Sequence, residues 1–197
     1  IPEQSHGCAS LIINESFFKE SLEMRRLLLR GMDALITNVP GYCVCVTTAD
    51  CVPVLLYDKK QHVVAAVHAG WKGTVKHIVS HVMDHLNQKF GTQGEDVVAC
   101  IGPSISLESF EVGDEVYDAF KESGFDMSLI SMKKKETGKY HIDLWEANRI
   151  ELLNAGVPAE QIEVAGICTY IHHDEFFSAR RLGICLLYTS DAADDLT

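Results

Sequence analysis

The sequence predicts an α+β fold, a layered α/β sandwich with a mixed sheet, formed by a single domain. The chain has 197 residues, of which 47% are hydrophobic and 23% charged, and this suits one globular domain with a substantial core. Strand-like and helix-like segments are mixed along the chain without the regular βαβ alternation of a doubly wound sheet. No internal repeat interrupts this pattern.

Strand signals dominate the first half of the chain. Residues 42–47 are β-branched, aromatic or sulfur-containing and follow Pro40-Gly41, which predicts a buried strand. Residues 52–57 and 62–68 repeat the signal and are joined by the polar residues 58–61, so we expect a hairpin. The hairpin brings one end of each strand close together. Two later strands are expected at residues 96–101 and 162–169.

Three helices are expected. Apolar residues recur at helical spacing over residues 74–90, which predicts an amphipathic helix. Residues 114–122 predict a second, short helix. Asp143 and Glu146 fit an N-cap and its reciprocal partner three residues later, and so begin a third helix that runs to about Ala155.

Charge and cysteine usage exclude several classes of protein. The chain carries 17 Lys and Arg against 28 Asp and Glu, a net charge of −11, and such an acidic chain repels both nucleic-acid phosphates and anionic lipids. No apolar run approaches the roughly 20 residues that span a bilayer, and no signal peptide is visible. Seven Cys is an odd number, which favours free thiols in a reducing compartment. We therefore expect a cytoplasmic protein with no nucleic-acid or membrane partner.

Cys51 and His68 are the first candidates for chemistry. Cys51 follows Thr47-Thr48-Ala49-Asp50, and His68 precedes the tight turn Ala69-Gly70-Trp71-Lys72-Gly73, so hairpin pairing could bring the two together. Glycines at 70 and 73 let the backbone approach a ligand closely. The alternative, that Cys51 is a small buried hydrophobe and His68 a hydrogen-bonded core imidazole, stays open from the pattern alone.

Other His and Cys residues are weaker candidates. His77, His81 and His85 are spaced four apart and superficially resemble a metal site, but we interpret them as a solvated polar stripe beside the apolar face of the helix. Cys43 and Cys45 alternate onto one face of the expected strand, where packing is favoured over chelation.

The polar cluster near the C-terminus suits the rim of a pocket. It consists of His172-His173 and Arg180-Arg181 around Phe176-Phe177, and a solvated surface run is the alternative. Nucleophile-elbow, dinucleotide-binding and P-loop motifs are absent from the sequence. A multicopper oxidase needs about ten His ligands, which nine His with three on one expected helix cannot supply.

Five motifs, taken together and in order, resemble the laccase-domain (YfiH, or multicopper polyphenol oxidase) family, whose members are purine nucleoside phosphorylases. The resemblance covers about residues 4–184. The motifs are Gln4-Ser5-His6-Gly7, Thr48-Ala49-Asp50-Cys51-Val52-Pro53-Val54, His68-Ala69-Gly70-Trp71-Lys72-Gly73, Ile101-Gly102-Pro103-Ser104-Ile105 with Phe110-Glu111-Val112-Gly113, and Phe176-Phe177-Ser178-Ala179-Arg180-Arg181.

The resemblance implies a compact α+β sandwich with one metal in a surface pocket, bound by His6, Cys51 and His68. Two imidazoles and one thiolate fill three tetrahedral positions and leave the fourth open, the arrangement of catalytic zinc. Zinc is the expected cofactor, and copper suits the same ligands.

The function implied is that of a metal-dependent purine nucleoside phosphorylase with adenosine deaminase activity. Its partners would be small molecules, a purine nucleoside and phosphate. The alternatives are a copper-dependent polyphenol oxidase and a non-catalytic metal-binding module. We expect Asp50 to act as a proton acceptor or to orient the site, Arg180 and Arg181 to hold phosphate or ribose oxygens, and Trp71 to shape the pocket wall.

The ends of the chain carry two further expectations. The family normally begins upstream with a Thr-Arg-x-Gly-Gly segment, and this chain begins at Ile1, so residues 1–184 would form the domain without its N-terminal segment. Residues 185–197 lose all apolar periodicity and are expected to be a non-native tail. Strand edges left open by these losses favour weak association, so we expect a monomer or weak homo-oligomer.

Overall fold

The main sheet of the computed structural model, which describes residues 1–183, has six strands in the order β1-β2-β4-β3-β5-β9. Antiparallel pairing joins β2, β4, β3 and β5, whereas β1 and β9 are added at the two edges in parallel. The sheet is therefore mixed, as the sequence predicted. Its strands are β1 (Ser10–Ile12), β2 (Ala34–Thr37), β3 (Val52–Asp58), β4 (Val63–Ala69), β5 (Val97–Ile101) and β9 (Ile162–Val164).

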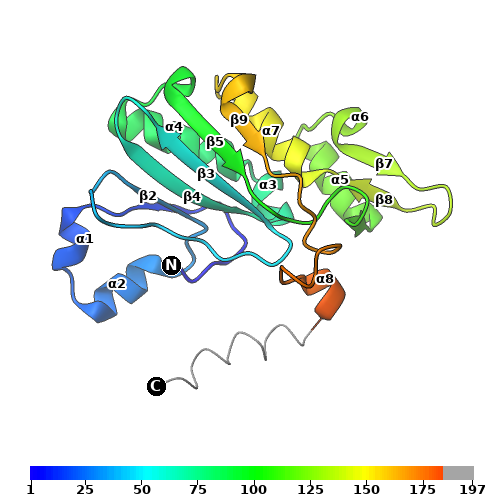
Figure 1. The fold of residues 1–197 in the computed structure, drawn as a ribbon, viewed down its shortest axis with the longest axis horizontal. Helices are drawn as coiled ribbons and strands as arrows, with labels where there is room; N and C mark the ends of the chain where they lie inside the picture. The colour runs from blue at the N-terminus through cyan, green and yellow to red at the C-terminus, as the bar shows by residue number, and fades with distance from the viewer. Residues whose placement is uncertain (184–197) are drawn as a thin grey trace.

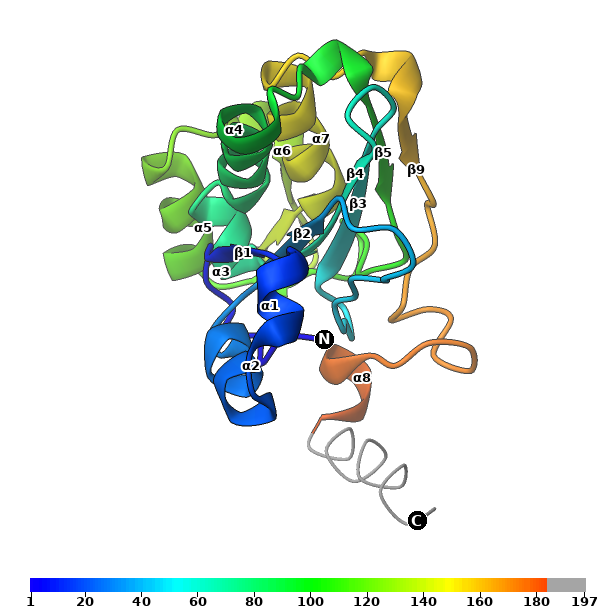
Figure 2. The same cartoon turned by 90° about the vertical axis from the view of Figure 1, so that its left-hand side faces the viewer.

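Helices α3 (Trp71–Val75), α4 (Ile78–Phe90) and α7 (Leu144–Asn154) pack against one face of this sheet (Figure 2). The apolar stripe of α4, which includes Val79 and Leu86, is buried against inward-facing strand residues such as Val54 and Val67. Burying side chains of this size contributes roughly 1.5–3 kcal/mol each, so the core rests on this layer.

Smaller elements lie around the sheet (Figure 1). A second sheet has the order β6-β8-β7 and lies with α5 and α6 at the end opposite α1 and α2. Within residues 1–183, no helix combines the length and apolarity that crossing a membrane requires. The bounds are α1 (Glu15–Lys19), α2 (Leu22–Leu29), η1 (Gly94–Asp96), β6 (Glu111–Val112), α5 (Asp114–Glu122), α6 (Met127–Ile130), β7 (Ser131–Lys133), β8 (Tyr140–Ile142), η2 (Ala159–Gln161) and α8 (Ala179–Leu182).

Several expected elements are confirmed. The hairpin is β3 with β4, and its register pairs Val52 with Ala69. Helix α5 and strand β5 lie where the sequence placed them, and Asp143 caps α7 by accepting a hydrogen bond from the Glu146 amide at 3.0 Å. The predicted reciprocal bond from the Glu146 side chain back to Asp143 is wrong, because the Glu146 carboxylate pairs with Arg149 at 3.1 Å. The expected tail at residues 185–197 lies outside the described residues.

The expected strand at residues 42–47 is wrong. This segment has no regular structure, and the Tyr42 side chain is 51% exposed. Strand β4 already pairs with β2 and β3, and β2 pairs with β1 and β4, so no pairing position is left for a strand beside them. The segment instead lies against the sheet face turned away from α4, and the expected burial of Cys43 on a strand face is also wrong, because its thiol is exposed.

The expected helix over residues 74–90 is broken at His77, and the strand at 162–169 ends early, at Val164. His77 has a φ of 57°, the left-handed conformation, and separates α3 from α4. His77 therefore does not share one helical face with His81 and His85, as the sequence predicted. Its side chain is 41% exposed, but its ring also bonds Glu151 and the Ser123 carbonyl.

Candidate metal centre

Three side chains that the sequence singled out converge at one end of the hairpin. His6 lies in the loop before β1, Cys51 immediately precedes β3, and His68 is on β4. One ligand atom from each lies within 4.8 Å of the others. The register explains half of this convergence, because Pro53 pairs with His68 and so places Cys51 beside the end of β4.

Gly70 provides the space in which the three side chains meet. A Cβ added at this position would lie 2.9 Å from Cys51 Sγ, 3.3 Å from His6 Cδ2 and 3.7 Å from His68 Cε1. The first of these contacts is too close for a Cβ unless Cys51 moves, so glycine lets the three side chains meet without displacement. At Gly73 a Cβ would lie 2.8 Å from the Gly7 carbonyl oxygen, so this glycine lets α3 approach the His6 loop.

Asp33, which the sequence analysis missed, positions two of the three candidate ligands. It is fully buried immediately before β2, and its Oδ1 lies 2.8 Å from His68 Nδ1. The same carboxylate accepts hydrogen bonds from the amides of Ser5, His6 and Gly7. One carboxylate therefore orients one imidazole and fixes the loop that carries the other.

The hydrogen bond to Asp33 determines which nitrogen of His68 is free. Because the carboxylate accepts from Nδ1, the Nε2 lone pair is left for a ligand, the arrangement common among metal-bound histidines. Burial lowers the pKa of His68, with the hydrogen bond to Asp33 opposing and His6 adding to the effect, so the ring is neutral near pH 7.

His6 is held in place despite its position near the chain start. Its φ of 58° is left-handed, and its amide donates to Asp33 Oδ1 at 2.9 Å. Its ring meets that of His68 edge to face, with the centroids 4.8 Å apart. Gln4 adds a second anchor through hydrogen bonds to the amide and carbonyl of Thr47, each 2.8 Å long.

Cys51 is half-buried among acidic neighbours. Burial raises the pKa of its thiol to about 11, and the charges of Asp50 and Asp33 add to the effect. The thiol is therefore protonated near pH 7 when no cation is bound. A cation that binds here must displace this proton, as is usual for thiolate ligands.

Asp50, next in sequence to Cys51, anchors Thr169 and the start of α8. It has a φ of 102° and is 9% exposed. Its two carboxylate oxygens accept from Thr169 Oγ1 and from the Arg180 amide, both at 2.7 Å. Because both oxygens are engaged, this geometry suits an orienting role better than that of a free proton acceptor.

The remaining predicted site residues are two exposed arginines, Arg180 and Arg181, and the half-buried Trp71. Arg180 donates to the Glu111 carbonyl at 2.7 Å and lies over the Phe110 ring, whereas Arg181 donates to the Tyr170 carbonyl at 3.3 Å. Trp71 begins α3 directly after Gly70, is half-buried and packs against the core.

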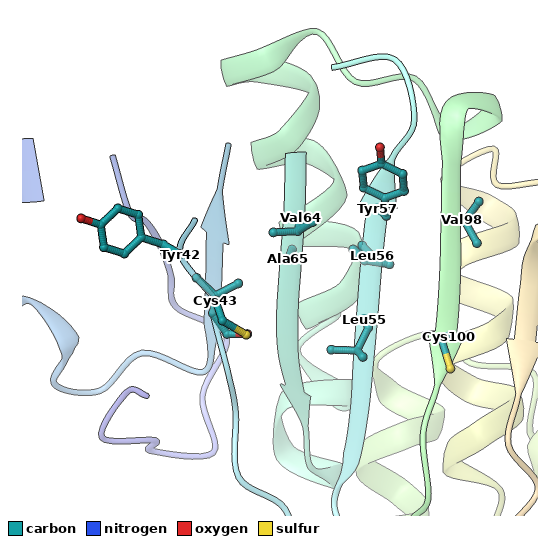
Figure 3. Close-up of a pocket in the computed structure, with 10 residues that line it drawn as sticks. Tyr42, Cys43, Leu55, Leu56, Tyr57, Val64, Ala65, Val98 and Cys100 are labelled. Atoms are coloured by element: carbon teal, nitrogen blue, oxygen red, sulfur yellow. The ribbon is translucent and has the colours of Figure 1, made fainter. Parts of the chain in front are cut away.

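A largely apolar groove lies elsewhere, on the sheet face away from α4 (Figure 3). It has a volume of about 430 Å³ and includes none of the three converging ligands. Its lining residues include Tyr42, Cys43, Leu55, Tyr57, Val98 and Cys100.

Comparison with known proteins places this arrangement among relatives. The family model described as multi-copper polyphenol oxidoreductase laccase matches residues 1–185. A purine nucleoside phosphorylase of Bacteroides thetaiotaomicron is 62% identical over 184 residues, which cover 93% of this chain and 68% of that protein. Adenosine deaminase RL5 of an unknown prokaryotic organism is 44% identical over 184 residues, covering 93% of this chain and 70% of that protein.

Solved structures agree with the sequence relatives. The crystal structure of YlmD from Geobacillus stearothermophilus superposes with a TM-score of 0.82 at 32% identity, covering 91% of this chain and 67% of that one. The chain thus spans about two thirds of the length of each of these three relatives.

Proposed function

Because this chain belongs to the multi-copper polyphenol oxidoreductase laccase family, we propose that it is a metal-dependent purine nucleoside phosphorylase with adenosine deaminase activity. The observation that carries the proposal is the convergence of His6, Cys51 and His68 within 4.8 Å around Gly70. The names of its relatives supply the substrate class, a purine nucleoside.

The three side chains fit a zinc ion. Zinc accepts imidazole nitrogen and thiolate sulfur in tetrahedral sites, in which neighbouring ligand atoms lie roughly 3.3–3.8 Å apart. The spacing within 4.8 Å therefore needs only a small closure, which the exposed ring of His6 can supply. Copper suits the same donors, so metal supply decides between the two.

A zinc ion held by these residues would supply Lewis-acid polarisation of a substrate heteroatom and activation of water. His68 and His6 would present their ring nitrogens, oriented by Asp33, and Cys51 its thiolate after loss of the proton. Asp50 would position α8 and Thr169 against the site.

Arg180 and Arg181 are proposed to bind phosphate. A guanidinium has five N–H donors, and each of these arginines donates to one backbone carbonyl, which leaves donors for an anion. In phosphorolysis a phosphate oxygen forms a bond to ribose C1′ while the C1′–N9 bond breaks and the purine leaves with a proton. In deamination water adds at C6 and ammonia leaves.

The test combines metal analysis with two activity assays on the wild type, Cys51→Ala and the matched control Cys100→Ala. We expect about one zinc per chain, phosphate-dependent release of hypoxanthine from inosine, and conversion of adenosine to inosine. Cys51→Ala should lose both metal and activity, whereas Cys100→Ala should keep both. Turnover that persists in metal-free Cys51→Ala would exclude this site.

The family description favours one competing function, oxidation of phenols by copper. Among residues 1–183, one group of three clustered His, Cys or acidic ligands could hold an ion, which is poor support for chemistry that needs several coppers. Stoichiometric copper with phenol oxidation and no nucleoside turnover would establish this alternative. Bound metal without any turnover would indicate a non-catalytic binding module.

A further inference from the structure

Two thiols lie side by side at the edge of the apolar groove. Cys43 Sγ and Cys45 Sγ are 3.6 Å apart and share a hydrogen bond. Cys43 is exposed and lines the groove (Figure 3), whereas Cys45 is half-buried. Neither belongs to the candidate metal centre, so their chemistry is independent of the proposed function.

The segment that carries this thiol pair is anchored on both sides. Before it, the Tyr42 ring stacks on Phe18 with centroids 3.8 Å apart. After it, Thr47 is held by two backbone hydrogen bonds to the Gln4 side chain. The anchors keep the two thiols adjacent, which gives each a high effective concentration toward the other.

Between the anchors, the backbone can adjust. In the part of the chain that the structure describes, residues 43–45 belong to no strand and make no backbone-to-backbone hydrogen bond. A disulfide needs the sulfurs to approach from 3.6 Å to about 2.05 Å. Because no sheet pairing has to break, this approach needs only local rotation.

Exposure distinguishes Cys43 from the other described thiols, and the short distance to Cys45 distinguishes the pair. Among residues 1–183, Cys43 is the exposed cysteine, Cys168 is buried, and the half-buried ones are Cys8, Cys45, Cys51 and Cys100. An accessible thiol poised beside a second one that can resolve it is the arrangement typical of redox-responsive cysteines.

We propose that Cys43 and Cys45 form a reversible dithiol–disulfide site that exchanges with low-molecular-weight disulfides of the glutathione type. The Cys43 thiolate attacks the small disulfide, forms a mixed disulfide and releases one small thiolate. The Cys45 thiolate then attacks Cys43 Sγ and displaces the second small thiol. The pair loses two electrons and two protons, and the small disulfide gains them.

The product joins residues two apart in a short ring at the surface, and exposed or strained disulfides of this kind are the readily reduced ones. Reduction by the small thiol therefore returns the pair to its starting state. Oxidation draws the Cys43 side chain toward Cys45, and so changes the wall of the groove.

The test treats the reduced full chain with glutathione disulfide, alkylates the remaining thiols and cleaves before aspartates. Cleavage before Asp33 and Asp50 isolates a fragment whose cysteines are Cys43 and Cys45 alone. We expect this fragment to become lighter by two hydrogens and to resist alkylation, and dithiothreitol to restore both thiols.

Two variants separate this proposal from simple surface oxidation. In Cys45→Ser the glutathione adduct on Cys43 should persist stoichiometrically, whereas in the wild type it should not accumulate. The matched control Cys100→Ser, which removes a thiol from the same groove, should behave as the wild type. A persistent adduct on wild-type Cys43, a bond between Cys43 and Cys100, or an unreactive fragment would overturn the proposal.

Discussion

Two histidine–carboxylate pairs have hydrogen bonds of nearly equal length but differ in how the second ring nitrogen of the histidine is used. His68 Nδ1 lies 2.8 Å from buried Asp33, and His77 Nδ1 lies 2.7 Å from buried Glu151. The second nitrogen makes the difference. That of His77 bonds the Ser123 carbonyl at 3.0 Å, whereas for that of His68 the described residues supply no hydrogen-bond partner, and it faces His6 and Cys51.

The comparison teaches that a carboxylate partner alone does not make a histidine a ligand. His77 has both nitrogens engaged by acceptors, and this fully bonded ring joins α4 to α7. His68 has one nitrogen oriented and the other left available. We call His77–Glu151 the structural pair and His68–Asp33 the site pair. The following experiments distinguish their roles.

Breaking the structural pair should give the largest effect. His77→Ala leaves the Glu151 carboxylate buried without its imidazole and places alanine at a left-handed φ, so we expect the free energy of unfolding to fall by about 3 kcal/mol. Urea unfolding measures this loss. Metal content per folded chain should stay unchanged, and His77→Asn, which tolerates the backbone conformation, should lose less. Loss of metal in His77→Ala would remove the distinction between the pairs.

Breaking the site pair should act on metal affinity. Asp33→Asn removes the carboxylate that orients His68 and holds the His6 loop, so we expect zinc affinity to fall by about 10- to 100-fold. Competition with a chelator measures it. Glu151→Gln is the matched control and should bind zinc as tightly as the wild type. Equal affinities of Asp33→Asn and the wild type would show that Asp33 only stabilises the fold.

A smaller change tests the space between the ligands. In Gly70→Ala the methyl carbon would lie 2.9 Å from Cys51 Sγ, so the ligands must separate by several tenths of an ångström. We expect zinc affinity to fall about tenfold, within the usual cost of overpacking. The melting temperature of the metal-free protein serves as the control. A large drop in that temperature with unchanged affinity would contradict a role for Gly70 in the site.

Asp58, a buried carboxylate without a histidine partner, is the reference for how the free energy of unfolding depends on pH. Burial raises the pKa of Asp58, but the nearby Thr92 hydroxyl, the amides of Gln61 and Lys60, which donate to Oδ1, and the charge of Lys60 outweigh it and lower the pKa overall. The ionised form is therefore favoured by folding. Its contribution is present above the unfolded pKa of about 3.9 and is lost as pH falls through the lower folded value.

Asp58→Asn should reduce the free energy of unfolding by about 1 kcal/mol at pH 7, and the difference from the wild type should shrink as the pH falls below about 4. Denaturant unfolding at several pH values measures both. A difference that grows on acidification would reverse the sign and contradict the assigned hydrogen bonds.

The sequence predicts those features whose causes are local. Hairpin β3–β4 and the motif around Gly70 follow from residues close together in the chain, and their register brings Cys51 beside His68. The family resemblance added His6. Asp33 could not be found in this way, because its partners are distant in the sequence and no motif surrounds it.

The errors have equally physical reasons. Residues 42–47 have strand propensity, but propensity reports only that side chains suit a half-buried surface, and the pairing positions of the sheet were taken by β1, β2 and β3. The spacing of apolar residues also does not report a single left-handed residue, so it could not predict the break at His77. That break depends on Glu151 and Ser123, which are far away in the sequence.

The three converging side chains come from three separate stretches of the chain, ahead of β1, ahead of β3 and at the end of β4. An ion bound to all three closes two loops of the polypeptide at once, as a cross-link does, and lowers the conformational entropy of the unfolded chain wherever it stays bound. A bound metal would thus also link the loop that carries His6 to the ends of β3 and β4.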